Sequence, residues 1–91
     1  MDFGRKAFVE LMASKDPAIR RVIEAGYEFV TNAFEPGAGP AAVTVKDAKA
    51  VAAQLRREGY LTELCSAYNE AGDPLPRMQS VWRKQQGARS S

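Results

Sequence analysis

The chain contains no histidine and a single cysteine, Cys65, which limits how it can be held together. An intrachain disulfide needs two cysteines, and structural zinc sites are built mainly from cysteine and histidine. The 91 residues must therefore fold around an apolar core, and 45% of them are hydrophobic. We predict one domain over residues 1–86, with a loop at residues 35–43 and a flexible tail at residues 87–91.

The balance of residue types favours helices. The sequence has fifteen alanines but only nine valines and isoleucines together. Alanine is the best helix former, whereas β-branched residues favour strands. We therefore predict an all-α domain of four to five helices, with Trp82 as an anchor of the core or of an interface and with no metal site or cofactor.

Apolar residues recur at helical spacing along most of the chain. A first helix is predicted from Phe3 to Ala13, and a second from Pro17 to Phe34. Asp16 is the expected N-cap of the second helix, and Pro17 suits its first turn. A third helix is predicted from Thr44 to Glu58, with Gly59 as its stop signal.

The segment after Gly59 fits two patterns. The helical template is matched by Leu61, Leu64, Cys65, Tyr68 and Ala71. A strand face at period two is formed instead by Tyr60, Thr62, Leu64, Ser66 and Tyr68. The helical match is the cleaner one, and a further helix is predicted from Leu75 to about Gln85. A C-terminal β-hairpin is the alternative.

The missing histidines also bear on catalysis. No Ser-His or Cys-His nucleophile pair can form within the chain, and its eleven acidic residues are scattered. We therefore expect no enzymatic activity, and we expect Cys65 to be buried and inert. The lone thiol and the lack of any long apolar stretch favour a cytoplasmic protein with no membrane association.

Positive charge is concentrated at the C-terminal end. Residues 1–73 hold nine basic and eleven acidic residues, a net charge of −2, whereas residues 74–91 hold four basic residues and no acid. This asymmetry is typical of a protein with a polyanionic partner, although a basic solubilising tail gives the same count.

Between residues 61 and 84, small residues and a turn glycine are followed by apolar residues at fixed offsets. These residues are Ala67, Ala71, Gly72, Met78 and Val81. With these residues the segment resembles the helix-turn-helix family of DNA-binding proteins. The resemblance implies a recognition helix that carries Arg77, Gln79, Ser80, Arg83 and Lys84. Arg and Gln side chains can read base edges, whereas Ser80, Arg83 and Lys84 would contact phosphates. Alternatively, this helix packs on the core and leaves its charges in water.

A second basic face is predicted on the third helix, where it is formed by Lys46, Lys49, Arg56 and Arg57. Such a face suits a phosphate backbone, and it is also typical of an ordinary solvated helix. The stretch Leu55–Leu61 is similar to the end of the recognition helix in winged-helix proteins. In that alternative, Tyr60–Tyr68 and Met78–Lys84 are the two strands of the wing.

These patterns together favour a small DNA-binding protein that regulates transcription and binds duplex DNA as a homodimer. The alternative is a non-enzymatic adaptor or inhibitor that binds a protein partner through an apolar helix surface. Val22, Ala25 and Phe29 would form that surface.

Overall fold

The computed structural model describes residues 3–37 and 47–86, which contain three helices and three strands. In chain order these are α1 (Phe3–Lys15), α2 (Pro17–Glu24), β1 (Glu28–Phe34), α3 (Ala48–Arg57), β2 (Tyr60–Tyr68) and β3 (Pro74–Gln85). The longest helix, α1, has 13 residues, whereas a membrane span needs about 20. None of the helices in the described part of the chain is long and apolar enough to cross a membrane.

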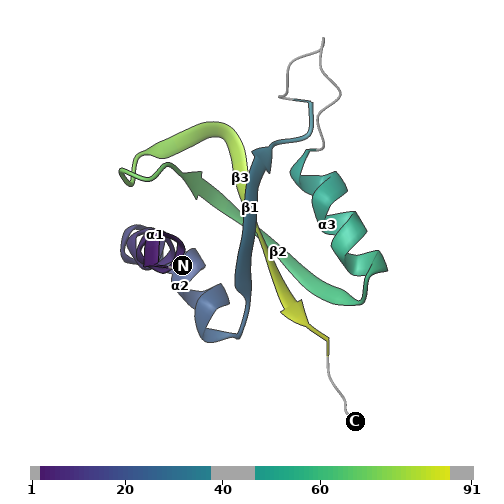
Figure 1. Ribbon diagram of the computed structural model, residues 1–91. Helices are drawn as coiled ribbons and strands as arrows, with labels where there is room; N and C mark the ends of the chain where they lie inside the picture. Colours follow the sequence, from purple (N-terminus) through teal and green to yellow (C-terminus); the bar gives the residue numbers. More distant parts are fainter. Residues whose placement is uncertain (1–2, 38–46, 87–91) are drawn as a thin grey trace.

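The strands form one antiparallel sheet in the order β1-β3-β2, so the last strand of the chain lies in the centre. Asn32 of β1 pairs with Ser80 of β3, and Leu64 of β2 pairs with Val81. Helices cover both faces of this sheet, with α1 and α2 on one side and α3 on the other (Figure 1).

The core has two parts, one on each face of the sheet. Successive side chains of a strand point to opposite faces, so the neighbours Val81 and Trp82 of β3 serve different clusters. Trp82 packs with Met12 and Ile19 beneath α1 and α2. Val81 packs with residues of α3, including Leu55. All five are buried, and Trp82 is a core anchor as expected.

The prediction of an all-α domain with four to five helices is wrong, because the protein has an α/β fold. The predicted second helix ends at Glu24, and its last seven residues, Glu28–Phe34, form β1. Gly26 adopts a left-handed φ of 100°, and its N–H donates to the Ile23 carbonyl at 3.0 Å. This conformation, which glycine adopts without strain, stops the helix. The predicted start of α2 is confirmed, since the Asp16 carboxylate accepts from the Ala18 N–H at 2.9 Å.

The helical interpretation of residues 60–85 is also wrong. The hairpin of the alternative is present, but its second strand begins at Pro74 rather than at Met78. Because both faces of the sheet are covered, β2 buries side chains in both directions. Leu64 packs toward α3, and its neighbour Cys65 packs toward α1 and α2. Two-sided burial spreads apolar residues along a strand and blurs the period-two pattern. The Gly59 stop is confirmed, with a φ of 98° directly after Glu58, the C-cap of α3.

The third helix is shorter at its start than predicted. It begins at Ala48, and the Asp47 carboxylate accepts from the Ala50 N–H at 2.8 Å as its N-cap. Thr44, the predicted start, lies outside the described residues.

We predict that Gly72→Ala destabilises the protein by about 1–2 kcal/mol, because its backbone is left-handed and its surroundings are crowded. Gly72 has a φ of 87°, and an added Cβ would lie 3.0 Å from Lys15 Cε and 3.3 Å from Leu11 Cδ2. Urea denaturation measures the change. Gly4→Ala is the control, since this glycine lies in α1 with no atom near its added Cβ. Alanine there is expected to stabilise the helix, so equal effects of the two changes would contradict the prediction.

Candidate ligand site

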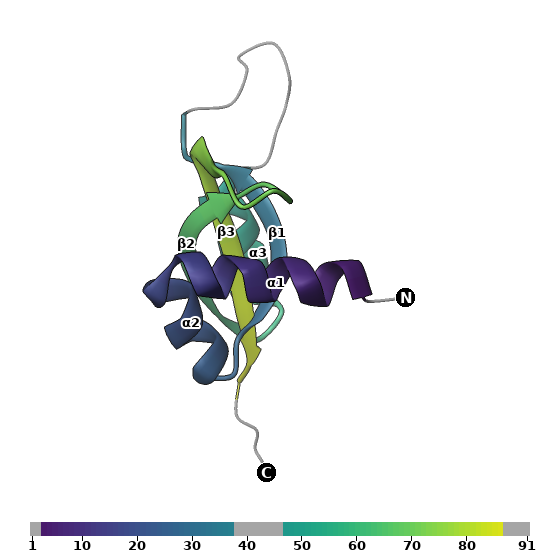
Figure 2. The same cartoon turned by 90° about the vertical axis from the view of Figure 1, so that its left-hand side faces the viewer.

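In Figure 2, α1 crosses one face of the sheet. Two adjoining pockets are lined by residues of α1 and β1. The first, which we call the polar pocket, has a volume of about 570 Å³ and is lined by Arg5, Phe8, Phe29, Val30, Thr31, Asn32, Tyr68, Asn69 and Glu70. The second, the apolar pocket, has a volume of about 400 Å³ and is lined by Arg5, Lys6, Val9, Glu10, Ile23, Tyr27, Glu28, Phe29 and Trp82. Arg5 and Phe29 line both pockets.

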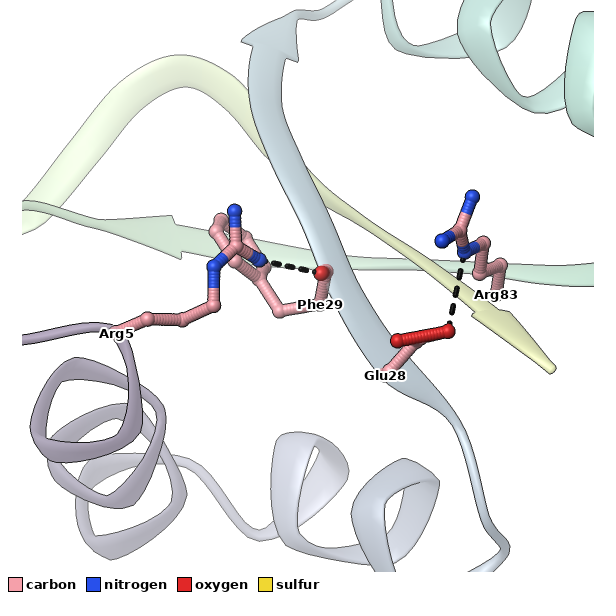
Figure 3. A network of polar contacts seen from close by, with 4 residues as sticks. All are labelled: Arg5, Glu28, Phe29 and Arg83. Atoms are coloured by element: carbon pink, nitrogen blue, oxygen red, sulfur yellow. Dashed lines mark hydrogen bonds and ion pairs between the residues drawn. The ribbon is translucent and has the colours of Figure 1, made fainter. Parts of the chain in front are cut away.

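Arg5 and Phe29 form the wall between the two pockets. The Arg5 guanidinium extends from α1 to β1, where its Nη1 donates to the Phe29 carbonyl at 2.7 Å (Figure 3). Its Cζ lies 5.4 Å from the centroid of the Phe29 ring. The ring also makes edge contacts with Phe8 at 5.7 Å and with Trp82 at 5.4 Å. These contacts fix the position of both side chains.

The polar pocket contains a buried amide group with an unsatisfied acceptor. Asn32 Nδ2 donates to the Tyr68 carbonyl at 3.2 Å. Asn32 Oδ1 is buried and has no hydrogen-bond partner among the described residues. A buried acceptor without a donor costs about 1–3 kcal/mol. Because this oxygen is buried, a ligand N–H in the pocket would offset the cost once the Asn32 side chain turns toward it.

Side chains of opposite charge line the same pocket. Arg5 comes from α1, and Glu70 comes from the turn between β2 and β3. Asn69 orders this turn, because its Oδ1 accepts from the N–H groups of Ala71 and Asp73, each at 2.9 Å. A pocket with one cation, one anion and one unsatisfied amide oxygen suits a small zwitterionic ligand with an N–H donor.

Tyr68 links the polar pocket to the helices. Its Oη donates to Asp16 Oδ2 at 3.2 Å. Burial raises the pKa of the Tyr68 hydroxyl above its usual value of 10.0, and the negative charge and hydrogen bond of Asp16 raise it further. The tyrosine therefore remains a neutral hydrogen-bond donor at physiological pH.

A buried hydrogen-bonded chain stabilises the middle of the sheet. Trp82 Nε1 donates to Ser80 Oγ at 2.8 Å, and Ser80 Oγ donates to the Ser66 carbonyl at 2.8 Å. The Ser66 carbonyl lies next to an irregularity in the pairing of β2 with β3, between Ser66 and Tyr68. The chain satisfies the polar atoms that Trp82 and Ser80 bring into the core.

The thiol of Cys65 is poorly suited to act as a nucleophile. Burial raises its pKa from 9.0 to about 11, with smaller contributions from the negative charges of Asp16 and Glu63. The thiolate is the reactive form of cysteine, so almost all of this thiol is unreactive at neutral pH. Within residues 3–37 and 47–86, no cluster of three or more His, Cys, Asp or Glu side chains is placed to hold a metal ion.

The residues predicted to bind DNA lie on two different elements. Lys49, Arg56 and Arg57 are exposed on α3, and Lys46 lies outside the described residues. The remaining residues, Arg77, Gln79, Ser80, Arg83 and Lys84, belong to β3 rather than to a recognition helix.

Several of these side chains have contacts within the protein. Ser80 is fully buried. Arg83 pairs with Glu28 at 3.2 Å, as Figure 3 shows, and its Cζ lies 4.6 Å from the Tyr60 ring centroid. On α3, Arg56 donates to Thr62 Oγ1 at 2.9 Å. The predicted recognition surface is therefore not a single free basic face.

The predicted protein-binding residues do not form one exposed strip either. Val22 and Phe29 pack against the cluster of Met12, Ile19 and Trp82, and Ala25 is the exposed C-cap of α2.

The residues of the polar pocket were missed because Arg5, Asn32 and Glu70 are far apart in the sequence. Only the Asn69–Asp73 turn gave a local signal, through its Asn, Gly and Asp residues.

The described residues thus form a small α/β domain with two adjoining pockets on one face of its sheet. The family model for class-II glutamine amidotransferases matches residues 8–63, which are 56 of the 91 residues. The chain therefore belongs to the class-II glutamine amidotransferase family. Comparisons with curated proteins and with solved structures give no match.

The family match corrects the functional expectations. It replaces the resemblance to helix-turn-helix and winged-helix proteins, and with it the prediction of a DNA-binding transcription regulator. The alternative of an adaptor or inhibitor that binds a protein partner is not supported either. The matched segment includes Asn32, whereas Arg5, Cys65 and Glu70 lie outside it.

Proposed function

We propose that this chain serves glutamine amidotransfer as a glutamine-binding domain and does not cleave the amide itself. The observation that carries the proposal is the unpartnered amide oxygen of Asn32, in a pocket lined by both Arg5 and Glu70. The family match supports it, because the family is named for transfer of the glutamine amide group.

Each polar group of glutamine has a complementary group in the polar pocket. The Arg5 guanidinium suits the α-carboxylate, and the Glu70 carboxylate suits the α-ammonium group. The Asn32 Oδ1 atom, which is buried, would accept an N–H of the side-chain carboxamide after the side chain turns toward the pocket. The pocket volume of about 570 Å³ lies within the usual range for small-molecule sites.

The proposal excludes catalysis by this chain alone because cleavage of an amide needs an activated nucleophile. Cys65 is the only cysteine, its thiol pKa is raised to about 11, and the chain has no histidine to act as its base. The proposed location is the cytoplasm, where a lone reduced thiol is usual. The homodimer expected from the sequence stays a prediction.

Calorimetric titration with glutamine tests the binding. We expect saturable binding of glutamine and weaker binding of glutamate, which lacks the carboxamide N–H groups. Asn32→Ala is expected to weaken glutamine binding about tenfold, through the lost acceptor. Glu70→Gln is expected to weaken it about fivefold, since this carboxylate is exposed and its ion pair is screened.

The matched control is Glu35→Gln, which changes an exposed carboxylate outside the polar pocket. It should leave the affinity unchanged, and a loss equal to that of Glu70→Gln would contradict the assignment of the pocket. Ammonia release from glutamine tests the second part of the proposal. We expect none above the protein-free rate, and release that disappears in Cys65→Ser would overturn it.

A further inference from the structure

We propose that the apolar pocket is a second ligand site, which binds a small aromatic carboxylate. This inference goes beyond the proposed binding of glutamine, because the two pockets differ in chemistry. One wall, formed by Arg5 and Phe29, separates them.

The side chains of the apolar pocket favour an aromatic ring. Val9 and Ile23 provide aliphatic surface, Tyr27 and Phe29 provide two aromatic rings, and the fully buried Trp82 packs against Phe29. Phe29 and Trp82 already meet edge to face, with centroids 5.4 Å apart and planes at 64°. A ligand ring placed here would extend this arrangement, which contributes energy beyond the burial of apolar area.

The volume of the pocket limits the size of the ligand. A dry apolar cavity of about 150 Å³ is sufficient to hold benzene. The apolar pocket has a volume of about 400 Å³ and is open to solvent on one side. One ring with a short substituent that reaches the opening fits this space.

The charges around the pocket favour an anionic substituent. Four charged side chains line it, namely Arg5, Lys6, Glu10 and Glu28. Glu28 is paired with Arg83 at 3.2 Å, so two cations and one carboxylate remain. Arg5, Lys6 and Glu10 are exposed. A carboxylate at the opening would therefore keep contact with water and lie near a net positive charge.

Phenylacetate is the probe that tests this proposal. Trp82 is the only tryptophan of the chain and packs against Phe29 of the pocket, so its fluorescence reports binding through that contact. We expect a saturable fluorescence change with phenylacetate. Acetate, which lacks the ring, and benzylamine, which carries the opposite charge, should give at least about fivefold weaker binding. Glutamine is absent from this assay, so its outcome does not depend on the polar pocket.

Two charge reversals provide the matched comparison. Lys6→Glu places a negative charge at the pocket and should weaken phenylacetate binding about fivefold. Lys49→Glu makes the same change at an exposed position of α3, on the opposite side of the sheet, and should leave binding unchanged. Circular dichroism checks that both variants fold. The absence of saturable binding, equal binding of benzylamine, or equal effects of the two reversals would overturn the proposal.

Discussion

Trp82→Ala is expected to lower the free energy of unfolding by about 3–5 kcal/mol. Trp82 is fully buried, and it contacts the cluster that joins α1 and α2 to the sheet. Its removal leaves a void beside Met12 and Ile19 and removes the donor to Ser80 Oγ. Because domains of this size are stable by only about 5–15 kcal/mol, the variant is expected to be close to unfolded at physiological temperature.

Urea denaturation followed by circular dichroism measures this loss without relying on the removed fluorophore. Leu61→Ala is the control, because Leu61 is a large hydrophobic residue of β2 that remains 41% exposed. Its truncation should change the stability by no more than about 0.5 kcal/mol. Similar losses in the two variants would mean that Trp82 is not the centre of this cluster.

Alkylation of Cys65 in the folded protein is expected to be at least tenfold slower at pH 8 than in the urea-unfolded chain. Its pKa of about 11 lies two units above the ordinary value of 9.0, so the thiolate fraction falls about 100-fold. The greater nucleophilicity of a high-pKa thiolate offsets part of this decrease. Iodoacetamide labelling followed by mass spectrometry gives both rates.

The pH profile of the labelling tests the cause of the slow reaction. The rate should rise about tenfold for each pH unit and level off near pH 11. Glu63→Gln should lower the midpoint only slightly, because burial is the largest cause of the shift. A midpoint near 9 in the folded protein would contradict this prediction.

The same shift links Cys65 to alkaline stability. The folded state holds the thiol proton more tightly than the unfolded state does. The contribution of the protonated Cys65 thiol to the stability of the folded protein is therefore complete below about pH 9. It is lost as the pH rises through about 11.

Local signals predicted the start of α2 and the end of α3, but they did not distinguish β1 from a helix. Asp16 and Gly59 act through their own backbone neighbourhoods, so the sequence was sufficient to place them. Residues 28–34 follow α2 after a short turn at residues 25–27 and continue its apolar spacing. Gly26 was the signal against the longer helix, because its left-handed backbone separates α2 from β1.

The candidate site could not be predicted in the same way, since the sheet brings its residues together. Arg5, Asn32 and Glu70 come from three separate elements or turns. The DNA-binding hypothesis failed for a related reason, because it grouped residues by their order in the chain. The fold buries Ser80 and pairs Arg83 with Glu28.

The central position of β3 has a consequence for the order of folding. β2 and β3 are joined by a short turn, and such a hairpin closes at a small entropic cost. Among the three described strands, β1 neighbours β3 alone, and Phe34 pairs with Met78, from which α3 and β2 separate it in the sequence. The hairpin is therefore expected to form early, and docking of β1 to be the slow step. Until that step is complete, the side of β3 that receives β1 remains an unpaired edge, where association between folding chains would begin.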